Sequence, residues 1–196
     1  MTGPLAATPA PSAPRLVACG KSPCIYPEHF VSASLGGFFA AELKRAGYDG
    51  IVIQGNADVP VYISIEDKRI DIKDAGHLWG LTNSKTREII QRELGGTPRI
   101  MSIGPAAENR TRIGIIFTDV GGAGSMGFGS VMGSKNLKAV AVKGSGTIHV
   151  ANPEKIALIR KRVQAMRGEG FFNLFGTPIT LPDTTVVKKV HCHGCP

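Results

Sequence analysis

Two groups of residues in this sequence have the types and spacing to do chemistry, and the first lies at the end of the chain. Cys192 and Cys195 are separated by two residues. Two thiolates at this spacing can bind one zinc ion or one cluster iron, and such a pair can also act as a redox dithiol. A complete site needs four ligands. His191 or His193 could complete a zinc site, whereas an iron–sulfur cluster requires cysteines from elsewhere.

The second group is a glycine-rich run over residues 119–138, between two apolar segments typical of strands. Glycine lets backbone N–H groups turn toward a ligand, which suits phosphate or another anion. Gly122, Gly124 and Gly127 have the spacing of the dinucleotide fingerprint, but that motif also requires a helix of several turns and an acidic residue about 20 positions on. We therefore predict an anion cradle, and a structural loop without a ligand remains the alternative.

Three positions upstream are further candidates. Arg15 follows a proline-rich stretch and could bind a phosphate through its planar guanidinium, although a solvated surface arginine is the ordinary alternative. The Gly36-Gly37 pair precedes an expected helix and is a second candidate anion site, or a simple tight turn. We interpret His77 as a structural histidine, because no further ligands lie near it at metal spacing.

Short apolar runs separated by turn residues predict several strands and three helices. The strands between residues 50 and 73 form an antiparallel meander in this interpretation. Apolar periodicity indicates the helices, with Asn83 or Ser84 expected to cap the second and Asn152 the third. The expected strands cover residues 15–19, 51–55, 61–65, 69–73, 99–103, 113–117 and 139–142, and the expected helices cover 38–46, 83–94 and 152–167.

Composition limits the class of protein. The chain has 196 residues, of which 42% are hydrophobic and 25 are glycine, as expected for a turn-rich globular protein. No apolar run could span a bilayer and no export signal is visible, so we expect no membrane partner. The formal charge of +8 lacks a basic block interleaved with aromatic residues, so we expect no nucleic acid either. A phosphate-bearing cofactor or an acidic neighbouring domain explains the charge.

Several segments resemble the N-terminal domain of the aldehyde ferredoxin oxidoreductase family, in the family's order and across nearly the whole chain. They are Gly3-Pro4-Leu5, Lys21-Ser22-Pro23, and the segments at residues 36–49, 103–109 and 131–139. The resemblance implies an α+β fold of mixed, largely antiparallel β-sheets with a few helices. It assigns residues 1–150 to a pterin-binding domain, and residues 151–196 to a helix and linker that lead to an iron–sulfur-binding domain.

The resemblance also implies a tungsten or molybdenum bis-pterin cofactor, a 4Fe-4S cluster, and a magnesium ion beside the pterin phosphates. Typical family members carry arginines where this chain has Gly121 and Ser125, and an asparagine in place of Ser34. The implied pterin-binding residues are Arg15, Ser34, Gly36, Gly37, Gly121, Gly122 and Gly124, and the first two of four cluster cysteines are Cys192 and Cys195.

The implied reaction is oxidation of an aldehyde to a carboxylic acid, with electrons passing through the cluster to ferredoxin or another electron-transfer protein. The resemblance places the protein in the cytoplasm and leaves a homo-oligomer open. We expect the chain alone to be inactive, because it lacks two cluster cysteines, the family's C-terminal domains and any credible catalytic acid or base. The alternatives are a zinc-binding module built on the terminal cysteines and a nucleotide-binding domain.

Overall fold

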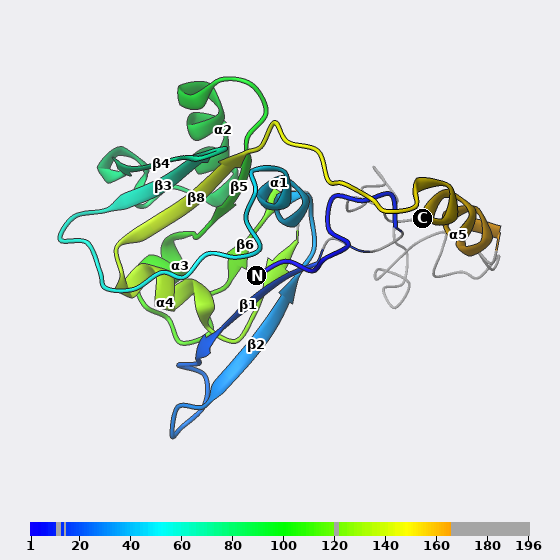
Figure 1. Ribbon diagram of the computed structural model, residues 1–196. Helices are drawn as coiled ribbons and strands as arrows, with labels where there is room; N and C mark the ends of the chain where they lie inside the picture. The colour runs from blue at the N-terminus through cyan, green and yellow to red at the C-terminus, as the bar shows by residue number, and fades with distance from the viewer. Residues whose placement is uncertain (11–12, 14, 120–121, 166–196) are drawn as a thin grey trace, which may run out of the picture.

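The chain folds around one six-stranded sheet and a separate two-stranded hairpin (Figure 1). The computed structural model describes residues 1–10, 13, 15–119 and 122–165, and all structural statements concern these residues. The hairpin consists of β1 (Leu16–Lys21) and β2 (Phe30–Leu35). The larger sheet has the order β4-β3-β8-β5-β6-β7 and contains β3 (Val61–Glu66), β4 (Arg69–Asp74), β5 (Arg99–Ser102), β6 (Ile116–Phe117), β7 (Ala123–Gly124) and β8 (Leu137–Lys143). The predicted α+β class is confirmed.

The sheet is mixed because β8 lies at its centre. β8 pairs parallel with β3 and antiparallel with β5, while the β3–β4, β5–β6, β6–β7 and β1–β2 pairs are antiparallel. Six of the seven β8 residues are buried, as expected for a strand covered on both faces. The predicted strand at residues 139–142 is therefore the central element of the sheet.

Five helices and one short 3-10 turn accompany the sheets. Thr82, rather than the predicted Asn83 or Ser84, caps α2, since its hydroxyl accepts a hydrogen bond from the Lys85 N–H. The Asn152 carboxamide caps α5 as predicted, accepting from the Lys155 N–H at 2.8 Å. Their bounds are α1 (Phe39–Arg45), η1 (Gly76–Leu78), α2 (Asn83–Leu94), α3 (Pro105–Glu108), α4 (Phe128–Ser134) and α5 (Pro153–Ala165). Figure 1 shows α5 apart from the sheets, and none of its residues is buried.

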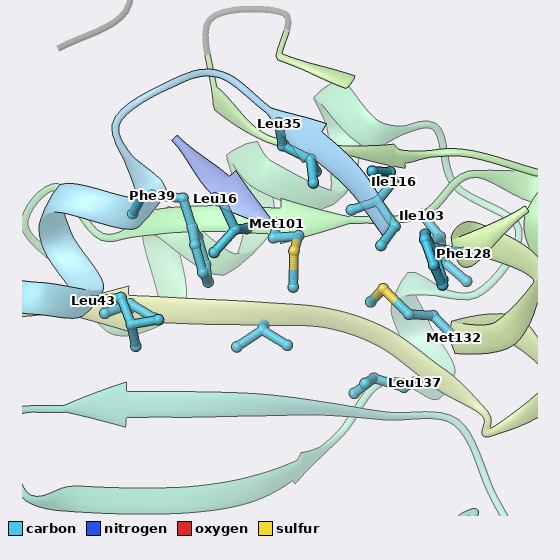
Figure 2. Close-up of a cluster of buried hydrophobic side chains, with 14 of the residues drawn as sticks. Leu16, Leu35, Phe39, Leu43, Met101, Ile103, Ile116, Phe128, Met132 and Leu137 are labelled. Carbon is cyan, nitrogen blue, oxygen red and sulfur yellow. The ribbon is translucent and has the colours of Figure 1, made fainter. Parts of the chain in front are cut away.

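Two hydrophobic clusters cover the two faces of β8. One cluster combines Leu16 and Leu35 of the hairpin with Phe39 of α1 and with Val140 and Val142 of β8. Figure 2 shows Leu16, Leu35 and Phe39 directed into this cluster. The second cluster lies on the α2 side of the sheet and contains Tyr62, Ala75, Leu78, Ile90, Ile100, Ala139 and Ala141. Alternation along β8 therefore fixes the hairpin and α1 on one face and α2 on the other.

A buried lysine interrupts the apolar β8 strand. The register between β3 and β8 shifts by one residue at Lys138, which forms a β-bulge, and its side chain is fully buried. Its ammonium pairs with Glu108 and donates to the Leu81 carbonyl at 2.8 Å, while Glu108 also accepts from the Gly80 N–H. Burial lowers the pKa of Lys138, and the Glu108 contact opposes that shift. The pair ties α3 and residues 80–81 to the central strand.

The structure corrects several sequence-based expectations. Residues 51–55 are not a strand, because this extended segment has no strand partner even though Ile51 and Ile53 pack on the core. The strand expected at residues 113–117 is reduced to Ile116–Phe117. Strand β2 was not predicted, since small residues occupy half of it. Helix α3 was also not predicted, and it is a single turn of four residues.

Helix α4 was missed because it lies inside the glycine-rich run. A Cβ at Gly129 would lie 2.3 Å from the Ile115 carbonyl oxygen, and one at Gly133 would lie 2.1 Å from that of Ala107. These glycines allow α4 to approach its neighbours closely, at the cost of low helix propensity. Part of the run therefore serves packing, since it contains α4 and the short strand β7.

Lys138→Met should lower the free energy of unfolding by about 3–5 kcal/mol, because it leaves the buried Glu108 carboxylate without its partner. Adding Glu108→Gln should recover much of this loss. The control is Lys143→Met, which removes the exposed Lys143–Glu66 pair and should change stability little. Urea denaturation of the four proteins measures the difference, and an equal effect of the two single lysine substitutions would contradict the prediction.

Candidate cofactor-binding site

Two glycine-containing loops meet where the β1–β2 hairpin ends. The first, residues 36–38, connects β2 to α1, and the second contains Thr118, Asp119 and Gly122 and lies between β6 and β7. The Thr118 hydroxyl donates to the Gly36 carbonyl oxygen at 2.8 Å, and the Thr118 N–H donates to the Gly122 carbonyl at 2.7 Å. One side chain therefore joins segments 82 residues apart in the sequence.

The glycines are required by this close approach. Gly37 has a φ of +97°, and a Cβ there would lie 2.8 Å from both the Thr118 hydroxyl and an Asp119 carboxylate oxygen. A Cβ at Gly122 would lie 2.3 Å from the Thr118 hydroxyl and 2.6 Å from the Gly36 carbonyl oxygen. At Gly124 a Cβ would meet the Leu35 side chain at 2.7 Å. Both loops therefore keep their backbones close together.

Asp119 makes a second connection between the loops. One carboxylate oxygen accepts from the Phe38 N–H at 2.9 Å, and the other lies 3.3 Å from the Arg99 guanidinium. The guanidinium also lies over the Phe38 ring, 4.7 Å from its centroid. Sequence analysis missed Thr118, Asp119 and Arg99. Asp119, which begins the glycine-rich run, was the one signal available in the sequence. Arg99 gave none, because only the folded sheet brings it near this site.

Most of the predicted pterin-binding residues lie at this end of the hairpin. Leu16 pairs with Leu35, so Arg15, one residue earlier, lies at the same end as Gly36. Ser34 pairs with Val17. Thr118 joins Gly36, Gly37 and Gly122, and Gly124 lies against Leu35. Gly121, Cys192 and Cys195 lie outside the described residues.

The arrangement can bind an anion from solvent. Arg15, Ser34, Ala123 and Ser125 are exposed, whereas Gly37 and Gly124 are buried. The Asp119 side chain is only 10% exposed and is occupied by Arg99 and the Phe38 N–H. The exposed arginine fits a phosphate of a pterin cofactor. None of the described residues in this group is positioned to act as a free acid or base. The geometry therefore supports a role in binding.

The other predicted ligand candidates have different roles. His77 Nε2 lies 2.6 Å from a Glu93 oxygen, and the Tyr62 hydroxyl donates to the other Glu93 oxygen, which confirms a structural role for this histidine. Cys19 and Cys24 are exposed free thiols. Among the residues that the structure describes, no group of three or more potential ligands could hold a metal. None of the described helices is long and apolar enough to cross a membrane.

Comparison with known proteins agrees with the resemblance noted in the sequence. The family profile described as aldehyde ferredoxin oxidoreductase, N-terminal domain, matches residues 1–144. The tungsten-containing aldehyde ferredoxin oxidoreductase of Pyrococcus furiosus is 46% identical over 170 residues, covering 85% of this chain and 28% of the relative. The protein of the same name from Pyrococcus horikoshii is 42% identical and covers 98% of this chain and 32% of the relative.

Two further matches carry different names. The aliphatic sulfonate oxidoreductase, WOR-like subunit, of Pyrococcus furiosus is 38% identical over 144 residues, covering 66% of this chain and 23% of the relative. The active-site complex BamBC of benzoyl coenzyme A reductase, solved with 1,5-dienoyl-CoA, matches with a TM-score of 0.77 and 34% identity. That match covers 92% of this chain and 27% of the solved chain. The chain thus spans about a third or less of the length of these relatives.

Gly122→Ala should lower the free energy of unfolding by roughly 1–3 kcal/mol, because the added methyl group forces the two loops apart. Gly3→Ala is the matched control, since a Cβ there meets nothing within 4 Å. Thermal or urea denaturation followed by circular dichroism measures both variants. Equal stability of the two variants would show that the loops do not depend on their close contact.

Proposed function

We propose a cofactor-binding role for this chain, which belongs to the aldehyde ferredoxin oxidoreductase family. Its site at the end of the hairpin binds the phosphates of a tungsten or molybdenum bis-pterin. The observation that carries the proposal is the hydrogen-bonded meeting of the two glycine loops beside the exposed Arg15. This meeting brings a cation and two stretches of small-residue backbone to one place on the surface.

The names of the relatives support a cofactor rather than a substrate role. They include tungsten-containing aldehyde oxidoreductases, an aliphatic sulfonate oxidoreductase subunit and a benzoyl coenzyme A reductase, so the named substrates differ in chemical class. All of them match this same portion, which covers at most about a third of each. A portion common to proteins with different substrates is expected to supply what those proteins share.

Each residue of the site has a role in binding. The planar Arg15 guanidinium pairs with a phosphate, and the backbone at Gly36, Gly37, Gly122 and Gly124 lies against it, since these positions carry no side chain. Ser34 would help to hold a magnesium ion beside the phosphates. When bound, the metal–pterin group supplies the two-electron redox chemistry, and the protein supplies binding and orientation.

We further infer that the 196 residues work as part of a larger cytoplasmic oxidoreductase. In that enzyme residues 1–150 form the pterin base, and residues 151–196 lead to the iron–sulfur domain. Cys192 and Cys195 are the first two ligands of a 4Fe-4S cluster. An aldehyde is oxidised to a carboxylic acid, and the electrons leave through the cluster to ferredoxin or another electron-transfer protein. The chain alone is inactive, because the substrate pocket and two cluster ligands belong to other sequence.

Arg15→Ala should reduce the pterin bound per chain by about tenfold, because it removes a charge-assisted hydrogen bond to phosphate. The chain is produced without oxygen in a host that makes the tungsten cofactor. Tungsten is then measured by mass spectrometry, and pterin by fluorescence after oxidation. Arg92→Ala is the control, since Arg92 is exposed on α2 and distant in sequence from both loops.

The same samples separate the cofactor proposal from the alternatives. A wild-type chain that contains zinc but neither pterin nor tungsten would support the zinc-binding module, and loss of that zinc in Cys192→Ser would locate it. Tight NAD binding without pterin would support a nucleotide-binding domain. Either result would overturn the proposed function.

A further inference from the structure

We propose that Asp119 and Arg99 are positioning residues for this site. Asp119 holds the loop of residues 36–38 beside Thr118 and Gly122, and Arg99 compensates the Asp119 charge so that it does not repel a bound anion. The inference rests on the proposed cofactor-binding function. We give neither residue a contact with the cofactor. Both act by holding the glycine loops in position.

The first step of the argument is geometric. The Phe38 N–H donates to Asp119 at 2.9 Å, and the neighbouring Thr118 hydroxyl donates to Gly36. Two consecutive residues of one loop therefore bind the residues on either side of Gly37. Because Gly37 has positive φ and no room for a Cβ, its own peptide orientation depends on these two anchors. Backbone donors bind an anion well only when such an orientation is set in advance.

The second step concerns charge. A carboxylate that is 10% exposed beside an anion site weakens anion binding unless a cation neutralises it. Arg99 is the cation in contact with Asp119, at 3.3 Å. Arg15 is consequently left to face the ligand, since the Asp119 charge is already paired within the protein.

The third step concerns the position of Arg99 in the sheet. Arg99 is the first residue of β5 and pairs with Val142 of the central strand, so its backbone is fixed by the sheet. Its guanidinium is held on one side by Asp119 and stacks on the Phe38 ring on another. Arginine can make both contacts with one planar group, which a lysine ammonium cannot do in the same way. The sheet thereby sets the position of both loops.

Hydrogen exchange at the Phe38 amide tests the geometric part without any cofactor. Asp119→Ala should accelerate exchange about ten- to hundredfold, because it removes the charged acceptor of that amide. Asp119→Asn should change it far less, since a carboxamide oxygen still accepts. The Gly80 amide, which donates to Glu108, is the internal control. Unchanged Phe38 exchange in Asp119→Ala would overturn the positioning role of Asp119.

Pterin retention tests the charge part. Arg99→Met should lower the bound pterin several-fold to about tenfold, because an unpaired carboxylate is left beside the phosphates. Arg99→Met combined with Asp119→Asn should restore most of it, since no charge is then left unpaired. A double variant that binds no more pterin than Arg99→Met would show that Arg99 contributes only structure.

Negative results in the two measurements would overturn different parts of the proposal. A wild-type chain without pterin would overturn the proposed function and, with it, the charge role of Arg99. The positioning role of Asp119 would still be decided by exchange at Phe38, because that measurement needs no ligand.

Discussion

The structure depends on the packing of the β1–β2 hairpin and α1 against one face of β8. Leu16 and Leu35 are almost fully buried in the cluster that contains Val140 and Val142. Burial of apolar area of this kind supplies most of the stability of a domain. If this packing is lost, Arg15 and the Gly36-Gly37 turn lose their position, and the two glycine loops separate.

Polar contacts then fix the orientation of loops that apolar packing positions only approximately. Hydrophobic contact is non-directional, so it brings the loops near one another without fixing the orientation of their peptides. Thr118 and Asp119 add that direction through hydrogen bonds across the contact, and Lys138 does the same for residues 80–81 behind the sheet. Unpaired polar groups are costly when buried, which makes such networks specific.

The sequence predicted elements that have strong local signals. It did not predict elements whose structure depends on contacts with residues distant in the sequence. The Asn152 cap, the β3–β4 hairpin and the central strand were predictable from capping, turn chemistry and a continuous apolar run. Helix α4 was not, since its glycines are explained by contacts with residues 107 and 114–115 rather than by helix propensity. The location of Arg15 and the glycine pairs in one site came from family resemblance, whereas Asp119 and Arg99 became visible only when the fold joined them.

The central place of β8 has a consequence for biosynthesis. Residues 137–143 enter the middle of a sheet whose other strands all precede them, and pairs such as Ile63 with Val140 are remote in sequence. Pairings of such high sequence separation form late, because loop-closure entropy must be overcome first. While the ribosome is still adding residues before 137, β3 and β5 have no strand between them, and the cluster under the hairpin lacks Val140 and Val142. The central cluster beneath the hairpin is therefore completed only after this strand has emerged.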